Sequence, residues 1–166
     1  MGHEGTIVQI NVSPGGMPKH SIPSGLITPL GLEGDGHAHR EIHGGPKKAV
    51  LLLAAETIQD LIAKGYPIVY GSLGENLTTR GFDLKDLRKG DRVRAGAAIL
   101  EITLPRLPCH QLNVYGETIR AEIADEKIWQ HDATSEYWGK SGLYCSVVQP
   151  GPVEPGDIIA IVSKLA

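Results

Sequence analysis

Glycine and proline divide this sequence into short segments, and that division limits the folds open to the chain. The 166 residues include 21 glycines and 11 prolines, more than a helical bundle uses and typical of short strands joined by turns. Apolar residues alternate with polar ones in 98–104 and less regularly in 5–13, and they run without a break through 49–53. These patterns predict strands, with 49–53 buried on both faces or in a barrel wall. The segment 142–148 predicts a further strand.

Two segments have helical spacing. In 54–64 the apolar residues recur on one face and a glycine follows, as at many helix ends. The segment 115–124 is the second helix candidate. Residues 17–29 contain three prolines and no clear period, which predicts a loop with one short strand. The pattern as a whole predicts a mainly β protein with a few covering helices, and the length favours one domain over residues 1–166.

Charge and composition exclude several classes of function. The formal net charge is -3, whereas a nucleic-acid-binding domain would carry a basic patch. No apolar run approaches the ~20 residues of a membrane span. Two cysteines are no disulfide framework and favour a reducing compartment. The first residues lack the layout of a secretory signal, so we expect a cytoplasmic protein.

Cys109 occupies the most informative position for chemistry. It follows the strand candidate 98–104 in the stretch LPRLPCHQL, where two prolines stiffen the turn because neither donates a backbone N–H. Arg106 and His110 are neighbours that favour the reactive thiolate form of a cysteine. The alternative is a small buried apolar residue, which is common for cysteine. Cys145 lies within a strand candidate, and we expect it to be structural.

Other polar clusters allow two interpretations each. His37, His39 and His43 would share one face of an extended segment and invite a metal site. No cysteine or carboxylate pair stands nearby at zinc spacing, which favours a solvated loop. Glu75 and Asn76 form either a plain turn or the polar floor of a pocket. The segment 113–137, with a rare tryptophan at 129, either covers the Cys109 turn or packs against the barrel, and the latter is favoured.

Four motifs follow one another in an order that resembles the MOSC domain family, named for the C-terminal domain of molybdenum-cofactor sulfurase. They are His43-Gly44-Gly45-Pro46, Gly74-Glu75-Asn76-Leu77, Gly90-Asp91 before the strand to Pro105-Arg106-Leu107-Pro108-Cys109, and the segment from Gly142 to Gly156-Asp157. The resemblance covers nearly the whole chain. It implies a mainly β fold, a distorted closed β-barrel like that of pyruvate kinase, with a few covering α-helices.

The resemblance also implies a role for Cys109. In the family this cysteine carries sulfur as a persulfide received from a pyridoxal-phosphate-dependent cysteine desulfurase, or it binds the molybdenum of a pterin cofactor. The residues that match the other motif positions are expected to line the cofactor pocket: His43, Gly44, Gly45, Glu75, Asn76 and Arg106. Arg106 suits a thiolate or a phosphate, and a surface ion pair is its rival role. Lys47 and Lys48 would add to an anion site or form a solvated pair.

Three functions remain open at this point. The first is a sulfur carrier or sulfurtransferase for molybdenum cofactor, with Cys109 as acceptor. Its partners would be a cysteine desulfurase, which alone holds pyridoxal phosphate, and a molybdoenzyme or cofactor-biosynthesis protein. The second is a molybdenum-dependent reductase of N-hydroxylated substrates, with Cys109 as metal ligand. The third is a non-catalytic metal- or cofactor-binding module that uses His37, His39 and His43. Neither His37, His39 nor His110 belongs to the family pattern.

Overall fold

The computed structural model describes residues 2–36 and 45–165, and all structural statements concern these residues. Seven of the described strands close into a barrel, because the first strand pairs with the last as well as with its neighbour. In their order around the barrel the strands are β1 (Glu4–Val12), β6 (Leu77–Arg80), β5 (Val50–Ala54), β9 (Leu143–Gln149), β8 (Ala98–Pro105), β7 (Arg92–Ala95) and β11 (Ile158–Ser163).

The pairing within the barrel is antiparallel except between β5 and β6, which run parallel. A parallel pair needs a crossover connection, and α2 (Ala55–Ala63) provides it. Short strands flank the barrel. β2 (His20–Ile22) extends the sheet beyond β1, and a separate small sheet consists of β10 (Gly151–Val153), β3 (Gly25–Thr28) and β4 (Gly31–Leu32).

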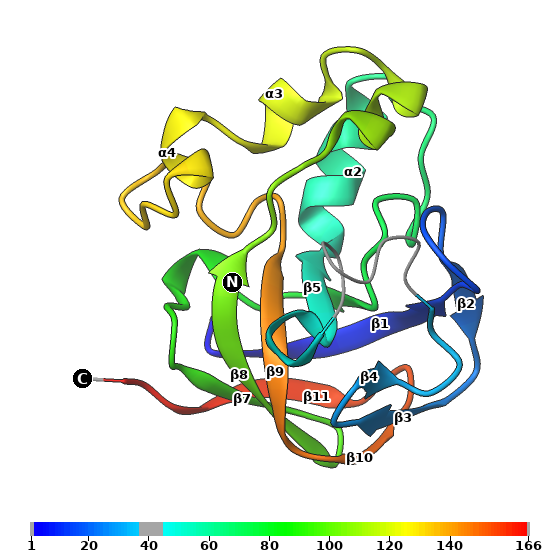
Figure 1. Ribbon diagram of the computed structural model, residues 1–166, viewed down its shortest axis with the longest axis vertical. Helices are drawn as coiled ribbons and strands as arrows, with labels where there is room; N and C mark the ends of the chain where they lie inside the picture. Colours follow the sequence, from blue (N-terminus) through cyan, green and yellow to red (C-terminus); the bar gives the residue numbers. More distant parts are fainter. Residues whose placement is uncertain (1, 37–44, 166) are drawn as a thin grey trace.

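The helices gather at one end of the barrel, where Figure 1 shows α2, α3 and α4 together. They are α2, α3 (Ile119–Ile123) and α4 (Glu126–Trp129), with the 3-10 turn η3 (His110–Tyr115) against α3. Of the other 3-10 turns, η1 (Pro46–Lys48) contacts β8 and β9, and η2 (Leu84–Asp86) contributes Leu84 to the barrel core. A second apolar cluster, distinct from the barrel core, packs α2 and α3 against η3 through buried residues such as Ile58, Leu112 and Ile119. None of the described helices is long and apolar enough to cross a membrane.

The sequence patterns predicted β1, β5, β8, β9 and one helix, whereas no pattern predicted β6. The apolar run 49–53 is confirmed as β5, whose five residues are all buried. The helix expected over 54–64 is confirmed as α2. The single helix expected over 115–124 is wrong in extent, because Gly116 adopts φ 150 and separates η3 from α3. The segment 17–29 holds two short strands, not one.

Leu52 tests the core of the barrel because it is fully buried in β5, opposite Leu77 of β6 and Leu143 of β9. We expect Leu52→Ala to lower the free energy of unfolding by about 2–5 kcal/mol, since the lost side chain leaves a cavity. The matched control is Val148→Ala, in β9 and 42% exposed, which should change stability by about 0.5 kcal/mol or less. Urea unfolding of both variants measures the difference, and equal losses would contradict this core.

Candidate functional site

The turn that carries Cys109 is fixed at both ends. β8 ends at Pro105, and the backbone N–H of Arg106 then donates to the Gly142 carbonyl at 2.9 Å. η3 begins directly after the cysteine, and the Leu112 N–H donates to the Cys109 carbonyl at 3.1 Å. Leu112 is fully buried in the second apolar cluster. The thiol is therefore held on a stiff bend between the barrel and the helical end.

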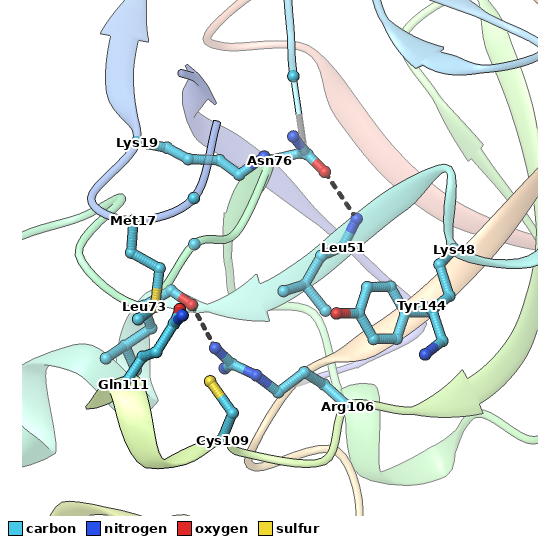
Figure 2. Close-up of a pocket in the computed structure, with 13 residues that line it drawn as sticks. Met17, Lys19, Lys48, Leu51, Leu73, Asn76, Arg106, Cys109, Gln111 and Tyr144 are labelled. Atoms are coloured by element: carbon cyan, nitrogen blue, oxygen red, sulfur yellow. Dashed lines mark hydrogen bonds between the residues drawn. The ribbon is translucent and has the colours of Figure 1, made fainter. Parts of the chain in front are cut away.

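Arg106 holds this bend from inside. The side chain is only 5% exposed. Its guanidinium donates to the Leu73 carbonyl at 2.5 Å and to the Ser141 carbonyl at 3.3 Å, and the Ser141 hydroxyl donates back to the Arg106 carbonyl. Arg106 is thus a buried cross-link among three segments and not a surface residue. Figure 2 shows its bond to Leu73, with the Cys109 sulfur beside the guanidinium.

Cys109 lies where two cavities meet. We name them the inner pocket, of about 60 Å³, and the outer groove, of about 500 Å³. Cys109 lines both cavities and is partly exposed. The residues shared by the two linings are Lys48, Cys109, Gln111 and Tyr144. Cys145, by contrast, is fully buried in β9, as predicted, and burial raises its pKa.

The site is rich in cationic groups. Lys19 and Arg106 line the inner pocket, Lys48 lines both cavities, and the described lining residues include no carboxylate. Lys19 forms a buried ion pair with Asp35, with 2.6 Å between Nζ and Oδ2. The Lys48 ammonium stands 5.5 Å from the centre of the Tyr144 ring, a cation–π distance. Such surroundings suit an anionic ligand.

Of the two polar side chains in the bend at Gly74-Glu75-Asn76, only that of Asn76 lines a cavity. Asn76 lines the inner pocket; its Oδ1 accepts from the Leu51 N–H at 2.9 Å and its Nδ2 donates to Asp35. Glu75 lies behind the pocket and lines neither cavity. It is fully buried, and its Oε2 accepts from the Gly71 N–H at 2.9 Å and from Thr78 at 3.1 Å.

Burial raises the pKa of Glu75 above its ordinary value, although the bonds from Gly71 and Thr78 and the charge of Arg106 act the other way. Its Oε1 is buried and has no hydrogen-bond partner within the described part of the chain. A neutral carboxyl group fits this environment better than an ionised one. Glu75 therefore acts as a buried support of the bend that carries Asn76.

The histidine-rich motif is only partly visible. His37, His39, His43 and Gly44 lie outside the described residues, so their predicted roles stay predictions. Gly45 is described and exposed, directly before η1. Residues 2–36 and 45–165 contain no group of three or more histidine, cysteine or acidic residues that could hold a metal ion. His110 is exposed and lines the outer groove.

Sequence reasoning missed several lining residues. Tyr144 occupies a strand, and no local signal marks it as a site residue. Lys19 follows a proline in a segment without period. Trp129 and His131 reach the outer groove from the end of α4, and a tryptophan 46% exposed is a useful signal only once the fold is known. Trp138 instead packs into the barrel core.

The barrel and its single cavity-lining cysteine define the class of protein. The sequence matches the MOSC domain over residues 39–160, and the chain belongs to this family. It is similar to protein YiiM of Escherichia coli (strain K12), 32% identical over 146 residues that make up 85% of this chain and 60% of YiiM. The crystal structure of that YiiM superposes with a TM-score of 0.71 at 25% identity, covering 98% of this chain and 71% of the YiiM chain.

Two further relatives extend the comparison. The uncharacterized protein YflK of Bacillus subtilis (strain 168) is 31% identical over 137 residues, which are 80% of this chain and 56% of YflK. A protein of Gibberella moniliformis named "Reductase" is 29% identical over 139 residues, 81% of this chain and 23% of that protein. The chain thus spans less than two thirds of each of these relatives. The MOSC family is associated with molybdenum cofactor.

The pH dependence of stability tests the proposed buried, neutral state of Glu75. The pKa of Glu75 is raised in the folded protein. The free energy of unfolding is therefore highest below the pKa of glutamate in the unfolded chain, about 4.3, and falls as the pH rises above that value. Glu75→Gln removes this titration. We expect the variant to match the parent near pH 4 and to be more stable at pH 7 by about 1–3 kcal/mol.

Urea unfolding at both pH values measures the effect, and the exposed Glu117→Gln serves as the control that should change neither value. A Glu75→Gln protein that is less stable at pH 7 would show that Glu75 is ionised and paired with Arg106.

Proposed function

We propose that the chain binds molybdenum cofactor at the junction of the inner pocket and the outer groove, with Cys109 as the thiolate ligand of molybdenum, and that it serves the reduction of N-hydroxylated substrates. The observation that carries the proposal is the position of Cys109, a partly exposed thiol on a stiff bend that lines both cavities. A thiol in that place reaches a ligand in either cavity.

The residues present fit such a cofactor in their chemistry. A soft thiolate suits a thiophilic metal. The cofactor carries a phosphate, and Arg106 and Lys48 bring cationic groups to the inner pocket, whereas the charge of Lys19 is balanced by Asp35. The outer groove, at about 500 Å³, has the size of ordinary small-molecule sites. When bound, the cofactor would supply the metal centre through which electrons reach the substrate.

The protein's own residues have separable tasks in this proposal. Arg106 fixes the bend and thereby the direction of the Cys109 side chain. Lys48 offers a cation at the boundary of the two cavities. Trp129 and Tyr144 give the outer groove aromatic walls that exclude water from one side of a bound molecule. The electrons would come from a redox partner, and the substrate oxygen would leave as water.

The name of the Gibberella moniliformis relative supports a reductase. This chain matches only 23% of that protein, so the name describes a much longer chain. A thiol that lines two cavities is placed to contact a retained small molecule in either one.

Replacement of the thiol tests cofactor binding directly. We expect Cys109→Ser, purified from a cofactor-competent host, to retain molybdenum at least about tenfold less well than the parent, because a ligand loss should exceed the effect of an outer-shell change. Elemental analysis measures the metal. The matched control is Cys145→Ala, which removes the buried thiol and should keep the parent's molybdenum content.

Thermal unfolding must show that both variants are folded. Equal molybdenum content in the parent and Cys109→Ser would exclude Cys109 as the ligand, and a folded parent without molybdenum would exclude stable cofactor binding.

A second function is supported by the exposure of the same thiol to the outer groove, the wider of the two cavities. As a sulfur carrier, the Cys109 thiolate would attack the outer sulfur of a desulfurase persulfide. A new S–S bond would form on Cys109, and the desulfurase thiolate would leave. Pyridoxal phosphate would belong to the desulfurase, and a molybdoenzyme or cofactor-biosynthesis protein would receive the sulfur.

Intact-mass measurement after incubation with a cysteine desulfurase, cysteine and pyridoxal phosphate distinguishes the two functions. A sulfur carrier gains the mass of one sulfur atom on Cys109 in the parent and in Cys145→Ala, and none in Cys109→Ser. The reductase proposal predicts no gain in any of the three while a known acceptor protein loads in parallel. Loading of Cys109 would favour the carrier.

A further inference from the structure

His131 is held in a backbone conformation that side chains rarely adopt. Its φ is 57, in the left-handed region, and it is the only non-glycine residue with positive φ in the described part of the chain. Its N–H donates to the Ile128 carbonyl and the following Asp132 N–H donates to the Lys127 carbonyl, each at 2.9 Å. This pair of bonds is the Schellman motif that ends α4, and His131 occupies the position where glycine is preferred.

Hydrogen bonds of the neighbouring residues hold the segment around His131. Asp132 accepts from the Thr134 N–H at 2.9 Å and from its hydroxyl at 2.7 Å, and these bonds lower the Asp132 pKa. Asp125 caps the start of α4 by accepting from the Ile128 N–H, and it also accepts from the Ser135 hydroxyl. A glycine at 131 would meet the same demands at lower backbone cost.

No hydrogen bond of the His131 side chain to the described residues offsets this backbone cost. His131 is exposed, and its imidazole makes no hydrogen bond within residues 2–36 and 45–165. It lines the outer groove, together with Trp129 and Cys109. Strained residues that the surrounding structure over-determines are typical of ligand-binding sites. The position of this imidazole therefore points to a bound molecule and not to stability.

The groove also indicates what the imidazole meets. Its described lining includes Lys48, His110 and His131 but no carboxylate. Imidazole and ammonium groups donate hydrogen bonds to anionic and other acceptor groups. Trp129 adds a large aromatic surface beside them. A molecule that combines an acceptor group with an aromatic ring would satisfy both features.

We propose that His131 is a ligand-contacting residue of the outer groove, where it donates a hydrogen bond to an anionic or acceptor group of the bound molecule. The inference deepens the proposed function, since it concerns the same groove. A phosphate of the cofactor and an oxygen of the substrate share this chemistry, and the experiment separates them.

The first arm needs no molybdenum. Phenyl phosphate, an aromatic anion, is titrated calorimetrically into the parent, His131→Gly, His131→Asn and the control His20→Asn, which changes an exposed histidine of β2. We expect His131→Gly to bind about tenfold more weakly, because it loses a charge-assisted hydrogen bond. The asparagine variant should lie between, since its amide still donates, and the control should match the parent.

Thermal unfolding of the same proteins tests the strain. His131→Gly should melt about 2–4 °C higher than the parent, because glycine relieves the left-handed conformation. A His131→Gly protein that binds phenyl phosphate more weakly but melts at a higher temperature would show that His131 contacts the ligand and does not stabilise the fold. Unchanged affinity of His131→Gly for phenyl phosphate, or a lower melting temperature that accounts for weaker binding, would overturn the inference.

The second arm identifies the source of the acceptor group in protein from a cofactor-competent host. Lower molybdenum content in His131→Gly assigns the contact to the cofactor. Full content with a raised KM for an N-hydroxylated substrate assigns it to the substrate. A parent that holds no molybdenum but shows the His131 dependence with phenyl phosphate would refute the proposed function and keep this inference.

Discussion

The buried guanidinium of Arg106 is the constraint on which the site depends. A charge taken out of water is costly unless its donors are satisfied. Here two backbone carbonyls, of Leu73 and Ser141, meet that need. These carbonyls belong to segments far apart in the sequence, so satisfying one side chain fixes the distance between them. Cys109 stands three residues further along the same bend, so the Arg106 hydrogen bonds also fix the position of Cys109.

Around this cross-link the end of the barrel is built from polar groups that satisfy one another. Asn76 joins the Leu51 backbone to Asp35, and Asp35 in turn binds Lys19. A buried ion pair adds little stability compared with apolar packing. Here the pair and Asn76 tie the segments of Lys19, Asp35 and Leu51 to one another. The barrel core supplies the stability, and the polar network decides how its open end is shaped.

This division explains what could be read from the sequence. Strands such as β5 and the helix α2 follow from local patterns, and the bend at Cys109 follows from two prolines after a strand. The cavity walls do not follow from local patterns, because Tyr144 and Lys19 come together with the bend only in the folded chain. Glu75 and Asn76 are adjacent and equally polar, yet only the fold decides which one faces the pocket. Positive φ at residue 131 leaves no trace in the sequence.

The two cavities differ in how they are built, and that difference bears on how the family can vary. The inner pocket is lined mainly by loop residues and the Arg106 bend, with Leu51 of β5 and Tyr144 of β9 from the barrel strands. The far wall of the outer groove comes from the end of a four-residue helix, α4, with Trp129 and His131. A change there disturbs one short motif and no barrel strand, and such connecting segments tolerate variation. A change at α4 would therefore alter the far wall of the outer groove and leave the lining of the inner pocket as it is.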